Sequence, residues 1–282
     1  MSTKRESPAL AKHYVRTIEQ AVTVGTKLPI SWFRGHSKTY GALTPTAYRK
    51  PPTWERGGYR ESWLAERFRL RAASVHASLP AWDEHLRWLL LMQHHGLPTR
   101  LLDWTENILV ALYFAVKDSM EDGEIWCVRP DRINNLSGYW LHSADHPIIK
   151  YLAAEVFLTS PDVNRDFKRL LKLQDVDTRR PVAFLPPLAF PRLSAQSSRF
   201  TIHPNPEPNG SNTIEELLNG PREIIRYLVP GECKKTLSRD LTSLGVTAET
   251  LFCSLDSLSE TIKIDVYDTD RGEHYPDPPL FD

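Results

Sequence analysis

Residues 93–105 read QHHGLPTRLLDWT, a stretch that joins two apolar segments of the chain. The segment before it, residues 84–95, carries leucines at helical spacing and is predicted to be a helix with Asp83 as its N-cap. Gly96 is the typical residue just beyond a helix C-terminus, because glycine adopts positive φ angles without steric cost, and Pro98 cannot continue a helix. The stretch is therefore predicted to start where one helix ends.

The segment after this stretch is predicted to be a second helix, with Thr105 as its N-cap. Its apolar run, residues 108–116, has no polar face, which indicates a helix that is buried on nearly all sides. Polar residues are thus confined between two apolar helices, and such groups are costly to bury unless they bond one another or a ligand. This polar group comprises Thr99, Arg100, Asp103, Trp104 and Thr105.

The rest of the chain interleaves helical and strand patterns. Strands are predicted at residues 29–33, 124–128, 182–185, 199–203 and 223–229. Helices are predicted at residues 8–25, 61–78, 147–176 (in two pieces), 232–244 and 248–252, followed by an amphipathic stretch from residue 255. Because these elements interleave, the sequence predicts one α+β domain, with residues 132–178 as a helical insert outside its core.

Composition places the chain among ordinary globular proteins. It has 282 residues, of which 41% are hydrophobic and 25% charged, and its formal net charge is zero. A balanced charge counts against a dedicated nucleic-acid binder, which is usually basic. The longest apolar run is far too short to cross a membrane, and no secretory signal is visible. The three cysteines are odd in number and widely spaced, which favours a reducing, cytoplasmic location.

Four blocks of sequence, in this order and spacing, resemble the FRG domain, a family of mostly prokaryotic proteins named after the tripeptide that appears here as Phe33-Arg34-Gly35. The most specific block is the stretch 93–105 itself. The resemblance covers roughly residues 27–260, which leaves an N-terminal helix at 1–26 and a C-terminal extension at 261–282. The blocks lie at residues 32–35, 93–105 with 111–115, 192–203, and 241–255.

FRG domains are similar to ADP-ribosyltransferases in predicted fold and occur in anti-phage or toxin-like settings. The resemblance therefore implies a core of two small β-sheets with surrounding helices, and a cleft between the sheets that handles NAD as substrate. Many ADP-ribosyltransferases use a late glutamate, whereas the matching block of this chain offers Gln196. An amide can hold a ribose hydroxyl or orient an attacking group, but it cannot act as a general base.

Arg34 and Gly35 follow a predicted strand. The planar fork of an arginine suits bidentate binding of a phosphate or carboxylate, and glycine lets a ligand approach the backbone closely. The alternative is that Arg34 pairs with a structural carboxylate such as Asp103.

His94 and His95 lie in the last turn before Gly96, where a helix C-terminus stabilises a protonated imidazole. One of them could face the pocket as a donor or general base. Alternatively, one caps the helix and the other packs in the core. No cysteine or further histidine lies at ligand spacing, so no metal site is expected.

Within the polar group, Asp103 is expected either to hold Arg34 or Arg100 in place or to supply negative charge to an oxocarbenium-like transition state. Trp104 could stack on nicotinamide or simply pack in the core. Thr99 is expected, with one of the histidines, to meet ribose or nicotinamide, and Arg34 to hold the diphosphate.

The leading hypothesis is an NAD-binding, ADP-ribosyltransferase-like enzyme that acts as a toxin or anti-phage defence effector. It would transfer ADP-ribose to a protein or nucleic-acid acceptor, or hydrolyse NAD, and an antitoxin or defence partner would fit that role. The alternatives are a non-catalytic module that senses a nucleotide or phage component, and a ribonuclease-like toxin that uses the histidines with Arg34 and Arg100.

Overall fold

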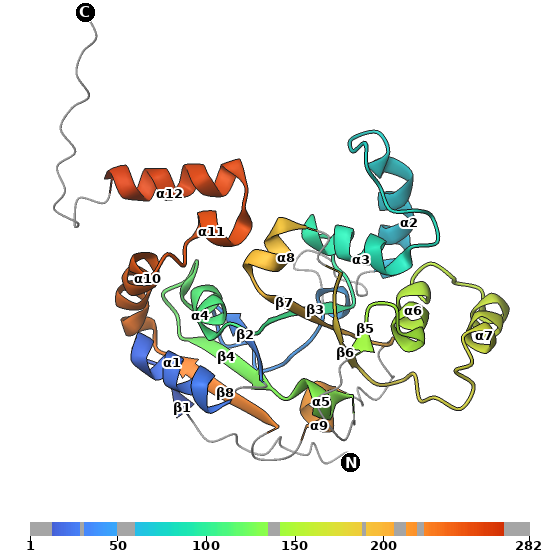
Figure 1. The fold of residues 1–282 in the computed structure, drawn as a ribbon, viewed down its shortest axis with the longest axis horizontal. Coiled ribbons are helices and arrows are strands. Elements are labelled where there is room, and N and C mark those ends of the chain that lie inside the picture. The colour runs from blue at the N-terminus through green and yellow to red at the C-terminus, as the bar shows by residue number, and fades with distance from the viewer. Residues whose placement is uncertain are drawn as a thin grey trace, which may run out of the picture.

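A computed structural model describes residues 13–28, 31–49, 60–134, 142–187, 190–205, 213–218 and 223–267. Within these ranges, eight strands form a single sheet in the order β1-β8-β4-β2-β3-β7-β6-β5 (Figure 1). The mixed α and β composition agrees with the sequence-based fold class, but the two separate small sheets are wrong. The strands are β1 (His13–Tyr14), β2 (Trp32–His36), β3 (Leu101–Thr105), β4 (Gly123–Val128), β5 (His142–Ser143), β6 (Val182–Leu185), β7 (Ser198–Ile202) and β8 (Ile224–Val229).

The sheet has a weak seam between β2 and β3. These strands are joined by one registered pair, Phe33 with Thr105, whereas β2 pairs with β4, and β3 with β7, over five positions each. The sheet therefore consists of two halves of four strands that meet at a single pair. The halves form one sheet because residues 101–105, interpreted from sequence as a polar connector, are the strand β3.

The two faces of the sheet follow from alternation along the strands. Phe33, Ile125 and Leu101 belong to clusters on the face covered by α1 (Ile18–Lys27), α3 (His85–His94), α4 (Ile108–Val116), α6 (Pro147–Ala154) and α10 (Lys234–Ser243). Trp32 and Trp126 alternate with them and pack on the opposite face, toward α5 (Pro130–Ile133) and α9 (Ile214–Leu217). Burial on both faces explains why the central strands are almost wholly enclosed.

Helix α4 lies directly on β2, and Gly35 is what permits this approach. A Cβ atom on Gly35 would lie 1.8 Å from the carbonyl oxygen of Ala111. The predicted helix over residues 108–116 is confirmed, but its N-cap is Asn107, whose side chain accepts from the amide of Leu109. Thr105, the expected cap, ends β3 instead.

The helical insert expected at residues 132–178 divides into two helices with different environments. Ile149 and Leu152 of α6 are fully buried in the same cluster as the leucines of α3, so α6 is part of the core rather than outside it. No residue of α7 (Pro161–Leu170) is buried. The expectation failed for α6 because its apolar face fills the space between α3 and the sheet.

Other sequence-based elements can be compared directly. Gly96 has a φ of +78°, as expected just after a helix, but the residue at the N-cap position of α3 is Glu84 rather than Asp83. The part of the predicted helix 8–25 that precedes residue 13 lies outside the described residues. The remaining elements are α2 (Glu61–Ala72), α8 (Pro191–Ala195), α11 (Ala248–Phe252), α12 (Leu255–Tyr267) and two 3₁₀ turns, Thr46–Tyr48 and Gly231–Cys233.

Helix α11 contacts both α8 and α12, and in Figure 1 α11 and α12 lie above α4. Among the helices of the described ranges, none combines the length and apolar character needed to cross a lipid bilayer. The cysteines are free thiols, with Cys127 buried and Cys253 exposed.

Candidate functional site

Arg34 of β2 lies at the seam and reaches toward β3. Its Nη1 donates to the carbonyl oxygen of Asp103 at 2.7 Å and lies 3.6 Å from the carboxylate of the same residue. Its Nε donates to Nε2 of His36 at 2.9 Å. Among the described residues, no acceptor bonds Nη2, so the edge of the guanidinium formed by its two terminal nitrogens remains available to a ligand. Burial lowers the pKa of Arg34, although Asp103 opposes that shift.

His36 and Glu124 support Arg34 from behind. Because the Nε of Arg34 can only donate, Nε2 of His36 must accept, and Nδ1 therefore carries the proton and donates to Glu124 at 2.9 Å. Burial lowers the pKa of His36, which keeps the ring neutral in this arrangement. Glu124 is fully buried and also accepts from the amide of Tyr40. The chain of bonds fixes both the tautomer of His36 and the orientation of the Arg34 guanidinium.

A small pocket of about 150 Å³ opens at the seam beside Arg34. The structure brings five of the sequence-predicted site residues to it: Arg34, Gly35, Asp103, Trp104 and Gln196. Helices α4 and α8 complete its wall. The other lining residues are Phe33, Thr105, Val110, Ala111, Phe114 and Arg192.

Asp103 is the carboxylate of this pocket, and its side chain is 51% exposed. Nε2 of Gln93 donates to it at 2.7 Å, and Arg34 lies on its other side. Of the two roles considered from sequence, these contacts favour the one in which Asp103 holds Arg34 in place. Arg100, the other expected partner of Asp103, bonds elsewhere.

Gln196 connects the pocket to the C-terminal helices. Its side-chain Nε2 donates to the carbonyl oxygen of Leu251 in α11 at 3.1 Å, and its backbone carbonyl oxygen accepts from the hydroxyl of Thr105 at 2.7 Å. The side chain is nearly buried. Its contacts are those of a residue that positions α8 and α11 around the pocket.

A second hollow of about 400 Å³ adjoins the first and shares Arg192 with it. His94 lines this hollow, and its ring stacks on that of Phe190 with centroids 4.8 Å apart. Burial lowers the pKa of His94, as does the neighbouring His95. Phe252, Lys117 and several small polar residues of the α11–α12 turn form the opposite wall.

Arg192 is a candidate site residue that sequence reasoning missed. Its guanidinium lies 4.6 Å from the ring centroid of Phe252, and among the described residues it forms no hydrogen bond or ion pair. Burial lowers its pKa, although the nearby Asp103 opposes that shift, so an anionic ligand would relieve the part of the desolvation cost that Asp103 leaves uncompensated. The signal that could have identified it is its place at the start of the block 192–196.

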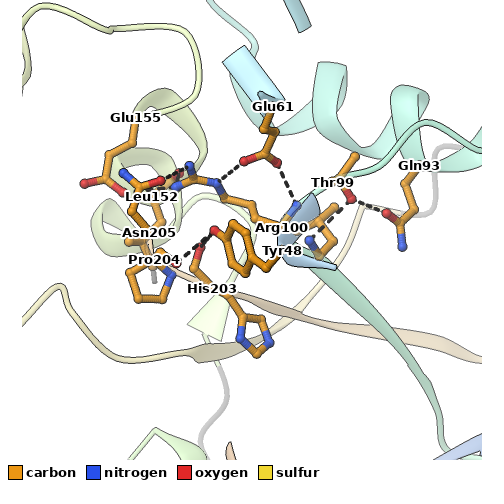
Figure 2. Close-up of polar contacts among 11 residues, drawn as sticks. Tyr48, Glu61, Gln93, Thr99, Arg100, Leu152, Glu155, His203, Pro204 and Asn205 are labelled. Carbon is orange, nitrogen blue, oxygen red and sulfur yellow. Dashed lines mark hydrogen bonds and ion pairs between the residues drawn. The ribbon is translucent and has the colours of Figure 1, made fainter. Parts of the chain in front are cut away.

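Three predicted residues are not brought to either hollow. His95 is exposed and lies past the end of α3. Thr99 is fully buried, and its hydroxyl donates to the side chain of Gln93. Arg100 precedes β3 at the end opposite Thr105 and enters a separate buried cluster with Glu61 and other residues, shown in Figure 2.

Trp104 contributes to the pocket wall mainly as a core residue. It is 2% exposed, and its Nε1 donates to the hydroxyl of Thr201 at 3.0 Å. The packing alternative considered from sequence therefore describes most of its surface. No group of three histidine, cysteine, aspartate or glutamate side chains in the described parts of the chain is arranged to hold a metal ion.

Comparison with known proteins gives one match. Residues 30–124 match the family model described as the FRG domain, and these residues include both the tripeptide at 33–35 and the stretch 93–105. The resemblance stated from sequence is thereby confirmed over that range. No curated protein and no solved structure matches the chain.

Proposed function

We propose that this chain, with its FRG domain at residues 30–124, binds NAD across the two adjoining hollows and acts on it as an ADP-ribosyltransferase-like enzyme. The observation that carries the proposal is the position of Arg192. This partly desolvated guanidinium, which forms no hydrogen bond or ion pair among the described residues, lines both hollows, so it marks the point where an anionic group would bind.

The shape of NAD fits this arrangement. A dinucleotide has two ring-bearing halves joined by a diphosphate, and the hollows of about 150 and 400 Å³ meet at Arg192. The terminal nitrogens of Arg34 offer a second fork for phosphate oxygens. Phe114 in the smaller hollow, and Phe252 and the stacked His94 in the larger one, offer surfaces for aromatic rings.

The proposed chemistry breaks the bond between nicotinamide and ribose. Nicotinamide leaves with the bonding electron pair, and the ribose carbon becomes oxocarbenium-like before a nucleophile adds to it. In hydrolysis the nucleophile is water, and in transfer it is a group on a protein or nucleic acid; in both reactions the nucleophile loses a proton, which passes to solvent. Asp103 mainly holds Arg34 in place, but its carboxylate also lies beside the smaller hollow, where positive charge would develop; the amide of Gln196 cannot accept the proton.

The alternative, a non-catalytic module that senses a nucleotide, is favoured by two of the same contacts. Gln196 stands where the resemblance places a late glutamate, and its amide is already bonded to Leu251. Asp103 is already bonded to Gln93. Such a module would use the same hollows and the same arginines, and it would bind NAD without cleaving it.

The two functions are distinguished by one pair of measurements. Calorimetric titration with NAD tests binding, and chromatography of the same mixture tests for released nicotinamide. Arg192→Ala is expected to weaken binding by tenfold or more, because hydrogen bonds to charged groups contribute about 1.5–3 kcal/mol. Arg165→Ala is the matched control, since Arg165 is exposed on α7 and lines neither hollow.

Each result has a defined reading. Binding with nicotinamide release supports the enzyme, and binding without release, in the presence of cell lysate as a source of acceptors, supports the sensor. If the wild-type protein does not bind NAD, both forms of the proposal fail. Toxin or defence activity is tested separately, by whether expression of the wild type, but not of Arg192→Ala, arrests growth of a bacterial host.

A further inference from the structure

The Arg100 cluster in Figure 2 borders a third pocket of about 610 Å³, which is larger than either of the two hollows lined by Arg192. It lies between the start of α2, the end of α6 and the helix α7. It shares no lining residue with the two hollows assigned to NAD. Whatever binds in it is therefore a separate ligand or a separate part of a partner.

The charged groups of this pocket leave one negative charge uncompensated. Arg100 is 2% exposed and faces two carboxylates, those of Glu61 at 2.9 Å and Glu155 at 3.1 Å. Its backbone amide also donates to Glu61, and its Nη2 donates to Asn205 at 3.0 Å. With every nitrogen of the guanidinium bonded, Arg100 is unavailable to an anion, and the described lining carries two carboxylates against one cation.

The wall also contains a hydrogen-bond acceptor that lacks a donor. The Oδ1 atom of Asn164 in α7 is itself buried, although the residue is only partly so, and it has no hydrogen-bond partner among the described residues. An unbonded buried acceptor is costly, and a ligand that brings an N–H group would remove that cost. The side chain of Glu155, which lines the same pocket and is 13% exposed, can accept further bonds.

Part of the remaining wall is apolar, and Ser62 and Thr159 add hydroxyl groups to it. Ala47, Val156, Leu158 and Pro161 line the same pocket as the acceptors. Aliphatic stems of lysine and arginine side chains pack on such surfaces while their charged ends stay bonded to polar groups. The pocket thus combines a surface for methylene groups with acceptors for a cationic end.

From this combination we propose that the pocket binds a guanidinium or primary ammonium group carried on a short aliphatic stem. The cationic end bonds Glu155 and Asn164, and the stem lies against Val156 and Leu158. The same chemistry occurs in free alkylamines and in the arginine or lysine side chains of a protein partner.

The experiment uses butylguanidinium as the probe and butanol as its neutral counterpart of the same stem length. Both are titrated into the full chain and followed by chemical shifts of the backbone and side-chain amides. Saturable shifts at Asn164, with butanol binding at least tenfold more weakly, are expected. Equal binding of the two probes, or the lack of any saturable shift with butylguanidinium, would overturn the proposal.

Three variants locate the binding. Glu155→Gln removes the charge and is expected to weaken butylguanidinium binding by tenfold or more, and Asn164→Leu by severalfold. Asp162→Asn is the matched control, because Asp162 lies on the same helix, is exposed, and pairs with Arg165. If Glu155→Gln does not fold, the proposal is tested by whether Asn164→Leu weakens butylguanidinium binding. If Asp162→Asn weakens butylguanidinium binding as much as Asn164→Leu does, the negative charge on the surface of α7, and not the pocket, attracts the cation.

Two further probes separate the sources of the cation. Agmatine is a free guanidinium amine, and a glycine-flanked arginine tripeptide presents the same group on a peptide backbone. Tighter binding of agmatine assigns the pocket to a free amine, and tighter binding of the tripeptide assigns it to a protein side chain. If neither competes with butylguanidinium, the pocket does not recognise this chemistry and the proposal is wrong.

Discussion

Two arginines lie at the seam pocket, and they differ in what already holds them. Arg34 bonds His36 and Asp103, so only the edge formed by its terminal nitrogens faces the pocket. Arg192 has no such bonds among the described residues and lies against Phe252. The first guanidinium is therefore oriented before a ligand arrives, whereas the second is free to adjust to it.

Arg34→Lys is expected to weaken NAD binding nearly as much as Arg34→Ala, by about tenfold or more. A lysine keeps the charge but presents one nitrogen, so it cannot bond the Asp103 carbonyl and still offer two parallel N–H groups to a ligand. A charged hydrogen bond contributes about 1.5–3 kcal/mol, which sets this magnitude. Calorimetric titration of both variants measures the effect.

Melting curves of both Arg34 variants provide the control for folding. If Arg34→Lys binds NAD as well as the wild type, the guanidinium is not a fork for the ligand. If both variants unfold, its bonds to His36 and Asp103 are its main role.

Sequence reasoning identified Arg34, Asp103 and Gln196 because they stand in the family blocks, but it gave Thr99 and Arg100 to the same site. Their neighbours along the chain could not reveal that Arg100 finds its carboxylates in Glu61 and Glu155, which lie 39 and 55 residues away. For the same reason, the sequence did not reveal that Arg192 lies at the site without an ion pair among the described residues. Whether an arginine is paired depends on contacts that are distant in sequence.

At the scale of elements, the sequence predicted α4 well because nine successive apolar residues permit few other structures. It missed β3 because LLDWT is short and its aspartate interrupts the apolar pattern. In the structure that irregularity has a cause: Asp103 lies at the seam, where it pairs with Phe200 of β7 but with no residue of β2. The place where the pattern failed is thus part of the candidate site.

Gly35→Ala is expected to destabilise the protein by about 1–3 kcal/mol or more, the usual range for overpacking a core. The added methyl group would overlap the Ala111 carbonyl, and backbone atoms of α4 cannot rotate away as a side chain can. The measurement is the free energy of unfolding in urea. Gly41→Ala is the comparison, because Gly41 has a φ of +71° but open space around its Cβ position; it should cost only about 1–2 kcal/mol. A smaller loss for Gly35→Ala would contradict the close packing of α4.

The two helices of residues 132–178 should respond differently to truncation. Ile149→Ala in α6 is expected to cost about 2–5 kcal/mol, because Ile149 is fully buried between α3 and the sheet. Val163→Ala in α7, where the side chain is 49% exposed, should change the free energy of unfolding by about 0.5 kcal/mol or less. Equal effects would show that α6 is not part of the core.

The whole molecule should lose stability in acid, partly through His203. Burial, with Arg100 and Arg34 nearby, lowers the pKa of His203 from 6.5 to about 3. Below pH 6.5 the unfolded chain therefore takes up a proton that the folded protein excludes, so this stability is present above pH 6.5 and is lost as pH falls toward 3. The loss is about 1.4 kcal/mol per pH unit, or about 2 kcal/mol between pH 6.5 and 5.

His203→Gln removes the titrating group and should flatten the pH dependence by that amount. Urea denaturation of the wild type and the variant at both pH values measures it. The variant's lower stability at neutral pH does not affect the comparison, which concerns the slope. Identical slopes would mean that His203 does not stay neutral in the folded protein.

The seam between β2 and β3 also determines how the structure would respond when a ligand binds at the site. One backbone pair joins the two half-sheets, and the contact of Arg34 with Asp103 crosses the same line. An anion that draws Nη1 of Arg34 away from Asp103 would remove that side-chain link, and the Phe33–Thr105 pair and the packing of α4 on both strands would then join the halves. Ligand binding should then be detectable without an activity assay, as faster amide hydrogen exchange along β2 and β3, while the amides that join β4 and β8 still exchange slowly. The exchange rates of these two strands would then report, without any added label, whether the site is occupied.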